Sequence, residues 1–144
     1  MTRLLLPPAI RTAVVEELEY EPGDTVKGVA FRLDADPTPD YIVQSAPSLC
    51  GNGGCEYLVV DGKTGRTTGR IFGSTLYVLK EEARGHPLIG AYGSLSANQA
   101  TYTRWSYDGR TYQRLGSRSI SGSARDTLLT QLRHIPPWKP RQSP

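Results

Sequence analysis

Turn-forming residues divide this chain into short segments, and this feature most limits the folds that it can adopt. Glycine and proline number 15 and 11 among 144 residues, a share above the roughly 12% of average proteins. Asp61-Gly62, Thr64-Gly65 and Asp108-Gly109 are typical of hairpin turns. No apolar run approaches the ~18 residues that a membrane-spanning helix needs. The pattern therefore predicts many short strands rather than long helices.

Runs of β-branched and aromatic residues lie between these turns and predict strands. The candidate strands lie within residues 26–33, 41–43, 57–60, 70–72, 76–79, 87–92, 101–107 and 111–112. Strands and helices do not alternate along the chain, which excludes Rossmann-like and TIM-barrel folds. We therefore expect a mainly β (α+β) protein, an antiparallel sheet, sandwich-like or propeller-like meander of about six to eight short strands.

Apolar spacing predicts one helix near each end of the chain. Ile10, Val14 and Leu18 recur at helical spacing after Pro7-Pro8 and predict a short N-terminal helix. A C-terminal helix should begin at a capping box that starts at Ser123 and should end before Pro136-Pro137. Its apolar stripe is Leu128, Leu129, Leu132 and Ile135. We expect a single β-rich domain over 1–135 and a flexible, basic, proline-rich tail over 136–144.

Charge is unevenly distributed along the sequence. Residues 1–114 contain 12 basic and 13 acidic residues, whereas residues 115–144 contain five basic residues and one acidic residue, Asp126. The isoelectric point near 9.0 thus arises from the C-terminal end. A nucleic-acid-binding domain is expected to carry a basic stripe on its folded body. Because the basic residues of the body are dispersed, we expect no nucleic-acid partner.

The chain has two cysteines, Cys50 and Cys55, separated by Gly-Asn-Gly-Gly. This spacing fits neither a four-ligand zinc site nor a C-x-x-C redox motif. Glycines can adopt positive φ and fold the loop back, which brings the two Cβ atoms within disulfide distance. We predict a local disulfide and an oxidising compartment, with the signal peptide removed ahead of Met1. The alternative is a pair of free thiols in a cytosolic protein whose Met1 is genuine.

An acidic loop precedes the strand at Tyr41. Asp34, Asp36, Thr38 and Asp40 lie at alternate positions, the spacing with which calcium loops direct oxygens to one centre. Pro37 occupies the place where such loops turn at glycine, and Arg32 would take the first ligand position. The alternatives are a weak calcium site and a turn that only resembles one.

Catalytic motifs are absent from the sequence. His86 lies in a turn sequence and His134 at the end of the C-terminal helix, and neither is near a G-x-S-x-G motif. We therefore expect a protein that is not an enzyme. Eight tyrosines outnumber two phenylalanines, a bias that suits a binding surface but is also common in strands with one solvated face.

Two segments resemble known bacterial envelope proteins. Leu33–Val43 resembles the calcium-loop-plus-strand unit of FG-GAP-like proteins. Cys50–Tyr57 and Gly69–Gly73 resemble small, mostly uncharacterised periplasmic proteins that carry these features in the same order. The wider arrangement, over residues 25–113, is similar to periplasmic lysozyme inhibitors and to immunity proteins that neutralise cell-wall-degrading toxin effectors.

This resemblance implies a periplasmic or secreted protein, monomeric or homodimeric, that blocks the cleft of a peptidoglycan hydrolase. The expected partner-binding residues are Asn52, Tyr57, Tyr92 and Ser94, on the disulfide loop and its neighbours. A rigid loop suits this role because ordering a flexible one weakens binding. The alternative is a structural or ligand-binding envelope module, possible calcium binding included, with no enzyme partner.

Overall fold

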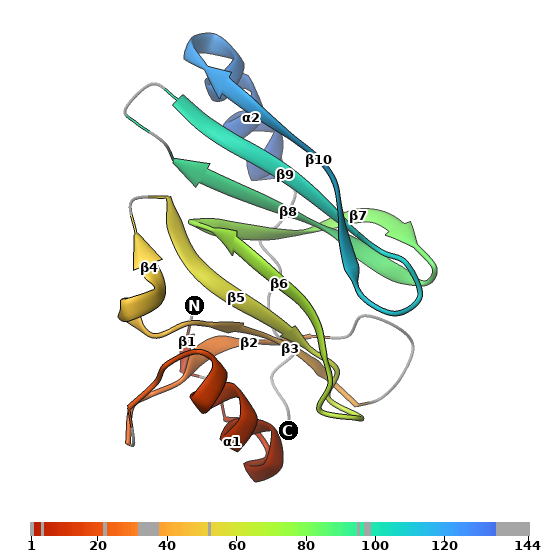
Figure 1. Ribbon diagram of the computed structural model, residues 1–144. Helices are drawn as coiled ribbons and strands as arrows, with labels where there is room; N and C mark the ends of the chain where they lie inside the picture. The colour runs from red at the N-terminus through yellow and green to blue at the C-terminus, as the bar shows by residue number, and fades with distance from the viewer. Residues whose placement is uncertain are drawn as a thin grey trace.

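The computed structural model describes residues 2–3, 5–21, 23–31, 38–51, 53–94, 96 and 99–134. These residues form four layers, in the order helix, six-stranded sheet, four-stranded sheet, helix (Figure 1). Every strand pair is antiparallel, and within the described ranges neither sheet closes into a barrel or a propeller. The predicted mainly β class with a helix near each end is confirmed.

The first sheet is built around the long strand β5. Two strands, β3 and β4, pair with one edge of β5, and β6 pairs with the other edge. The members of this sheet are β1 (Thr2–Arg3), β2 (Lys27–Phe31), β3 (Asp40–Gln44), β4 (Cys50–Gly51), β5 (Gly54–Val60) and β6 (Thr67–Gly73). A 3-10 turn, η1 (Pro47–Leu49), leads from β3 into β4. Two of these strands have only two residues each, which is why they add to the predicted count.

The second sheet is a meander in which each strand pairs with its neighbour in sequence, in the order β10-β9-β8-β7. Its members are β7 (Thr75–Ala83), β8 (His86–Ser94), β9 (Gln99–Tyr107) and β10 (Tyr112–Ser121). The predicted turn at Asp108-Gly109 connects β9 to β10, and Gly109 has φ +102°. The sheet therefore has two edges, β7 and β10.

The predicted N-terminal helix forms as α1 (Pro8–Glu17) and covers the outer face of the first sheet. Ile10, Val14 and Leu18 are all buried and pack with side chains of β3 and β5. The helical spacing of these three residues places them on one side of α1, which is the side that contacts the sheet.

Apolar side chains also fill the space between the two sheets. Val59 and Ile71 from the first sheet and Ile89 from the second have no exposed surface. Tyr112 packs in the same layer, and its hydroxyl donates a hydrogen bond to the Pro87 carbonyl at 2.9 Å. The indole nitrogen of Trp105 is buried there without a hydrogen-bond partner in the described part of the chain.

The C-terminal helix α2 (Gly122–His134) covers one end of the outer face of the second sheet. It begins at Gly122, one residue before the predicted cap at Ser123; β10 ends at Ser121, and Gly122 at the junction has φ +57°, a conformation that favours glycine. Leu128 packs with Tyr92 and with Tyr102. Ile135 and the predicted tail at 136–144 lie outside the described residues.

Candidate functional site

The two cysteines join the ends of a tight hairpin. Cys50 in β4 pairs with Cys55 in β5, their sulfur atoms are 2.10 Å apart, and their Cα atoms are 4.0 Å apart. The predicted disulfide is therefore confirmed, and both cysteines of the chain are in it. Such a bond is consistent with an oxidising, extracytoplasmic location.

Glycines allow this hairpin to lie directly against neighbouring backbone. Gly54 has φ +132°, and a Cβ at this position would lie 2.0 Å from the carbonyl carbon and oxygen of Gly73 at the end of β6. A Cβ on Gly93 in β8 would lie 3.1 Å from the Gly53 carbonyl oxygen. The hairpin is thus held by the disulfide at its base and by close contacts with the ends of β6 and β8.

An exposed aromatic residue, Phe72 of β6, lies beside the hairpin. Its side chain is 47% exposed, and a Cβ on Gly53 would lie 3.1 Å from its Cε1 atom. Arg70, two residues earlier on the same face of β6, donates from Nε to Glu56 at 2.6 Å and pairs with Glu17 of α1 at 3.2 Å. We call Gly53, Glu56, Arg70 and Phe72 the hairpin patch.

The predicted partner-binding residues have different surroundings. The Tyr57 side chain is 3% exposed between the sheets, its hydroxyl donates to the Ser74 carbonyl at 3.5 Å, and burial raises its pKa. Tyr92 is 7% exposed, and its hydroxyl accepts a hydrogen bond from Arg125 Nε at 2.9 Å. Two buried rings that are packed in the core are not available to a partner's cleft.

The other two predicted residues belong to the region of the hairpin. Ser94 ends β8, is half-buried, and has its carbonyl oxygen 3.8 Å from where a Cβ on Gly53 would lie. Asn52 follows Gly51 in the chain and lies outside the described residues. The fold thus brings the disulfide loop and the end of β8 together, although they are far apart in sequence.

Sequence reasoning missed the two most accessible side chains of the patch, Arg70 and Phe72. The signal was present in the alternation of β6, where Ile71 is fully buried between its two exposed neighbours. In such an alternating strand, residues two apart lie on the same face, and the residues two before and two after Phe72 are polar. An exposed apolar side chain on a polar face often marks an interaction surface.

The predicted calcium loop lies only partly within the described residues. Asp34 and Asp36 lie outside the described residues, and Thr38 precedes the sheet. Asp40 is the first residue of β3, and its Oδ1 accepts a hydrogen bond from the Gly62 amide at 2.9 Å. This bond joins the start of β3 to the turn that follows β5. No group of three or more metal-binding side chains occurs in the described ranges, and calcium binding stays a prediction.

Two titratable residues of the second sheet, His86 and Asp108, contact the backbone of the turns next to them. The ring of His86 stacks on Tyr107 at a centroid distance of 3.9 Å, and its Nδ1 lies 3.0 Å from the Arg84 carbonyl oxygen. Hydrogen bonds from the backbone amides of Thr111 and Arg110 lower the pKa of Asp108. In both cases the polar atom contacts the backbone of its own turn.

Neither helix in the described part of the chain has the length and apolar character to cross a membrane. Comparison of the chain with protein-family models, with curated proteins and with solved structures found no match.

Proposed function

We propose that the protein is a non-enzymatic binding protein of the periplasm or cell exterior that inhibits a peptidoglycan-degrading enzyme by occluding its cleft. The observation that carries this proposal is the position of Phe72, a half-exposed aromatic side chain beside a disulfide-stapled hairpin. The class of partner comes from the resemblance to lysozyme inhibitors and to effector-immunity proteins.

Rigidity of the hairpin supports a role in binding. Immobilising a flexible side chain on association costs about 0.5–1.5 kcal/mol, and ordering a loop adds to that cost. Here the Cys50–Cys55 bond and the contact of Gly54 with Gly73 restrict the hairpin before any partner arrives. Binding through the patch would therefore avoid most of the cost of ordering this loop.

The chemistry of the patch also suits a protein partner. Aromatic residues and arginine are enriched at the centres of protein interfaces, as Phe72 and Arg70 would be here. Glycosidases that cleave glycan strands use two carboxyl groups on either side of the scissile bond. The amide of Asn52 is a donor that suits such carboxylates, whereas the Ser94 hydroxyl would first have to release the Ser96 carbonyl to which it donates at 3.3 Å.

The decisive experiment is a cell-wall lysis assay with a panel of muramidases and amidases, in which the protein is titrated against each enzyme. Stoichiometric inhibition of one enzyme would support the proposal. The Phe72→Ala variant should then weaken inhibition about tenfold or more, because it removes the apolar centre of the contact. Leu5→Ala is the matched control, since Leu5 is also exposed, at 77%, but belongs to the N-terminal segment; it should change inhibition less than about twofold.

Two results would count against the proposal. If no enzyme of the panel is inhibited and none forms a complex with the protein, the proposal of a hydrolase inhibitor is rejected. The alternative, a structural or ligand-binding envelope module, is then favoured. If inhibition occurs but Phe72→Ala and Leu5→Ala behave alike, the inhibitory surface lies elsewhere on the molecule.

A further inference from the structure

The outer edge of the second sheet presents an exposed strand. Within the described ranges β10 pairs only with β9, so its other side has no neighbouring strand. Its first residue, Tyr112, is buried between the sheets, and Ile120 is buried against α2. Between these anchored ends, residues 113–119 are all exposed. An exposed strand of this length offers a row of backbone N–H and C=O groups for pairing with another chain.

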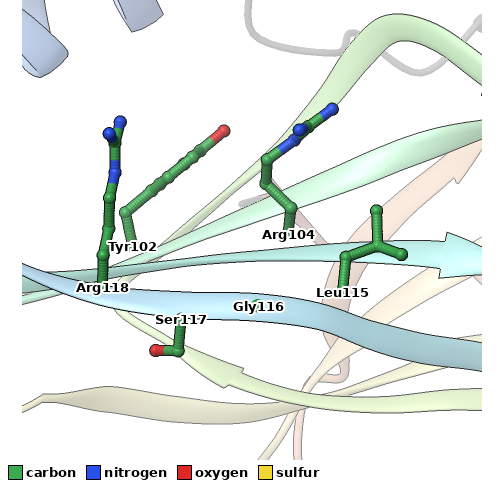
Figure 2. A pocket seen from close by; sticks show the side chains of 6 residues that line it. All are labelled: Tyr102, Arg104, Leu115, Gly116, Ser117 and Arg118. Carbon is green, nitrogen blue, oxygen red and sulfur yellow. The ribbon is translucent and has the colours of Figure 1, made fainter.

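A hollow of about 410 Å³ lies along this strand, on the face that α2 covers only at one end. Figure 2 shows Tyr102, Arg104 and Arg118 projecting from that face together with Leu115, whereas Ser117 points to the other side. A Cβ on Gly116 would meet no atom within 4 Å, so this glycine leaves the floor of the hollow open. The bulge between Arg114 and Gly116 places the 59% exposed Leu115 at its rim.

The edge is basic on both of its faces. Arg118 pairs in register with Tyr102, which faces α2, and Arg114 pairs with Trp105, which faces the first sheet. Cross-strand partners point to the same side of a sheet, so the two arginines lie on opposite faces of β10. The sequence of β10 contains no acidic residue.

One arginine of the hollow, Arg118, is placed to bind an anionic group. The Arg118 guanidinium carbon lies 5.9 Å from the centre of the Tyr102 ring, a cation–π contact, and among the described residues no carboxylate pairs with its N–H groups, so they can bind one from a partner. Arg104 of the same hollow is already paired with Glu81 of β7. A tyrosine phenol is neutral at physiological pH, and burial raises the pKa of Tyr102 further, so it does not repel an anion.

We infer that β10 is a docking edge for an extended, acidic segment of a partner protein, which adds to the second sheet as a further strand. Main-chain hydrogen bonds to β10 would give affinity, and acidic side chains opposite Arg114 and Arg118 would give specificity. A second copy of this chain suits the edge poorly, because β10 has arginines and no acidic residue, so pairing of β10 with β10 would bring two basic edges together without charge complementarity. The other edge, β7, carries Glu81 and Glu82 and does not attract an acidic segment. This inference uses residues other than the hairpin patch and does not depend on the proposed inhibition.

The test uses the full chain and a fluorescein-labelled peptide of about ten residues, rich in glutamate, valine and threonine. Two further peptides serve as comparisons: one has lysine in place of glutamate, and the other has two adjacent central prolines, which remove backbone donors without changing the charge. Fluorescence anisotropy should show saturable binding of the acidic peptide and at least about tenfold weaker binding of both others. Amide hydrogen exchange should slow in β10 and not in β7.

Charge reversal on the protein identifies the edge. Arg118→Glu should weaken binding of the acidic peptide about tenfold or more, and Arg114→Glu provides a second variant if the first folds poorly. Lys80→Glu is the matched control, because Lys80 is an exposed cation on β7 of the same sheet; it should weaken binding less than about threefold.

Four results would overturn the inference. The first is no binding up to about 1 mM peptide. The second is equal binding of the proline-containing peptide, which would show electrostatic attraction without strand pairing. The third is equal loss of affinity in Arg118→Glu and Lys80→Glu. The fourth is a dimer of this chain that dissociates on Arg118→Glu, which would show that a second copy occupies the edge.

Discussion

Replacing Gly54 by alanine tests how the stapled hairpin is held. Gly54 has φ +132°, and the new Cβ would lie 2.0 Å from backbone atoms of Gly73. A non-glycine residue in this region of φ costs about 1–3 kcal/mol. Forcing a methyl group into a packed backbone contact adds about 1–3 kcal/mol. We therefore expect Gly54→Ala to lower the free energy of unfolding by about 2–6 kcal/mol, a large part of the about 5–15 kcal/mol typical of a domain.

Gly51→Ala is the matched control, because Gly51 faces Gly54 across the same hairpin and its Cβ would meet no atom within 4 Å. This change should leave stability unaltered or raise it by up to about 1 kcal/mol, since alanine restricts the unfolded chain. Urea titrations of both variants under non-reducing conditions, followed by tryptophan fluorescence, give the two free energies provided that the m-value is unchanged. If the two variants differ by less than about 1 kcal/mol, the hairpin is not pressed against β6 and the argument for its rigidity fails.

Three further changes test other parts of the fold. Cys50→Ser with Cys55→Ser should lower stability by about 2 kcal/mol, because the bond closes a loop with a sequence separation of only 5; reductant should lower the urea midpoint of the wild type but not of the double variant. Burial raises the pKa of Tyr112 above the usual 10 in the folded protein. The unfolded chain therefore loses this proton at a lower pH than the folded protein does. The free energy of unfolding should fall as pH rises above about 10, by up to about 1.4 kcal/mol per pH unit. Tyr112→Phe should reduce that alkaline slope in urea titrations between about pH 9 and 11, and an unchanged slope would contradict the assignment. Ile89→Ala should cost about 2–5 kcal/mol, because Ile89 has no exposed surface between the sheets; a cost below about 1 kcal/mol, measured by urea denaturation, would show that the core is not closely packed there.

Local rules predicted the features of this fold that depend on nearby residues. The spacing of Ile10, Val14 and Leu18 is sufficient for α1, since residues four apart share one side of a helix. The turn between β9 and β10 follows from Asp108-Gly109, where Gly109 has φ +102°. The Cys50–Cys55 bond follows from a short glycine-rich separation. Each of these depends on interactions within about a dozen residues.

The candidate site depended on contacts that no local pattern contains. Tyr57 and Tyr92 lie on strands that are covered on both faces, β5 by α1 and the second sheet and β8 by the first sheet and α2. A tyrosine on such a strand is buried whichever way it points, whereas the sequence suggested a solvated face. Glu17, the last residue of α1, pairs with Arg70 of β6, whereas Phe72 two residues further along the same face is 47% exposed, a difference that no local pattern of β6 contains.

The sequence by itself determined the mainly β class, a helix near each end, the hairpin turns and the disulfide, because these features depend on backbone preferences and short separations. Only the tertiary structure decided that the second sheet stacks on the first, that the hairpin lies against the ends of β6 and β8, and that β10 is left as a basic edge. The physical reason is that a side chain is buried only where a second element packs against its face, and that element can be distant in sequence. A strand's alternation shows that it has two faces, and the packing of the layers decides which of them solvent or a partner can reach.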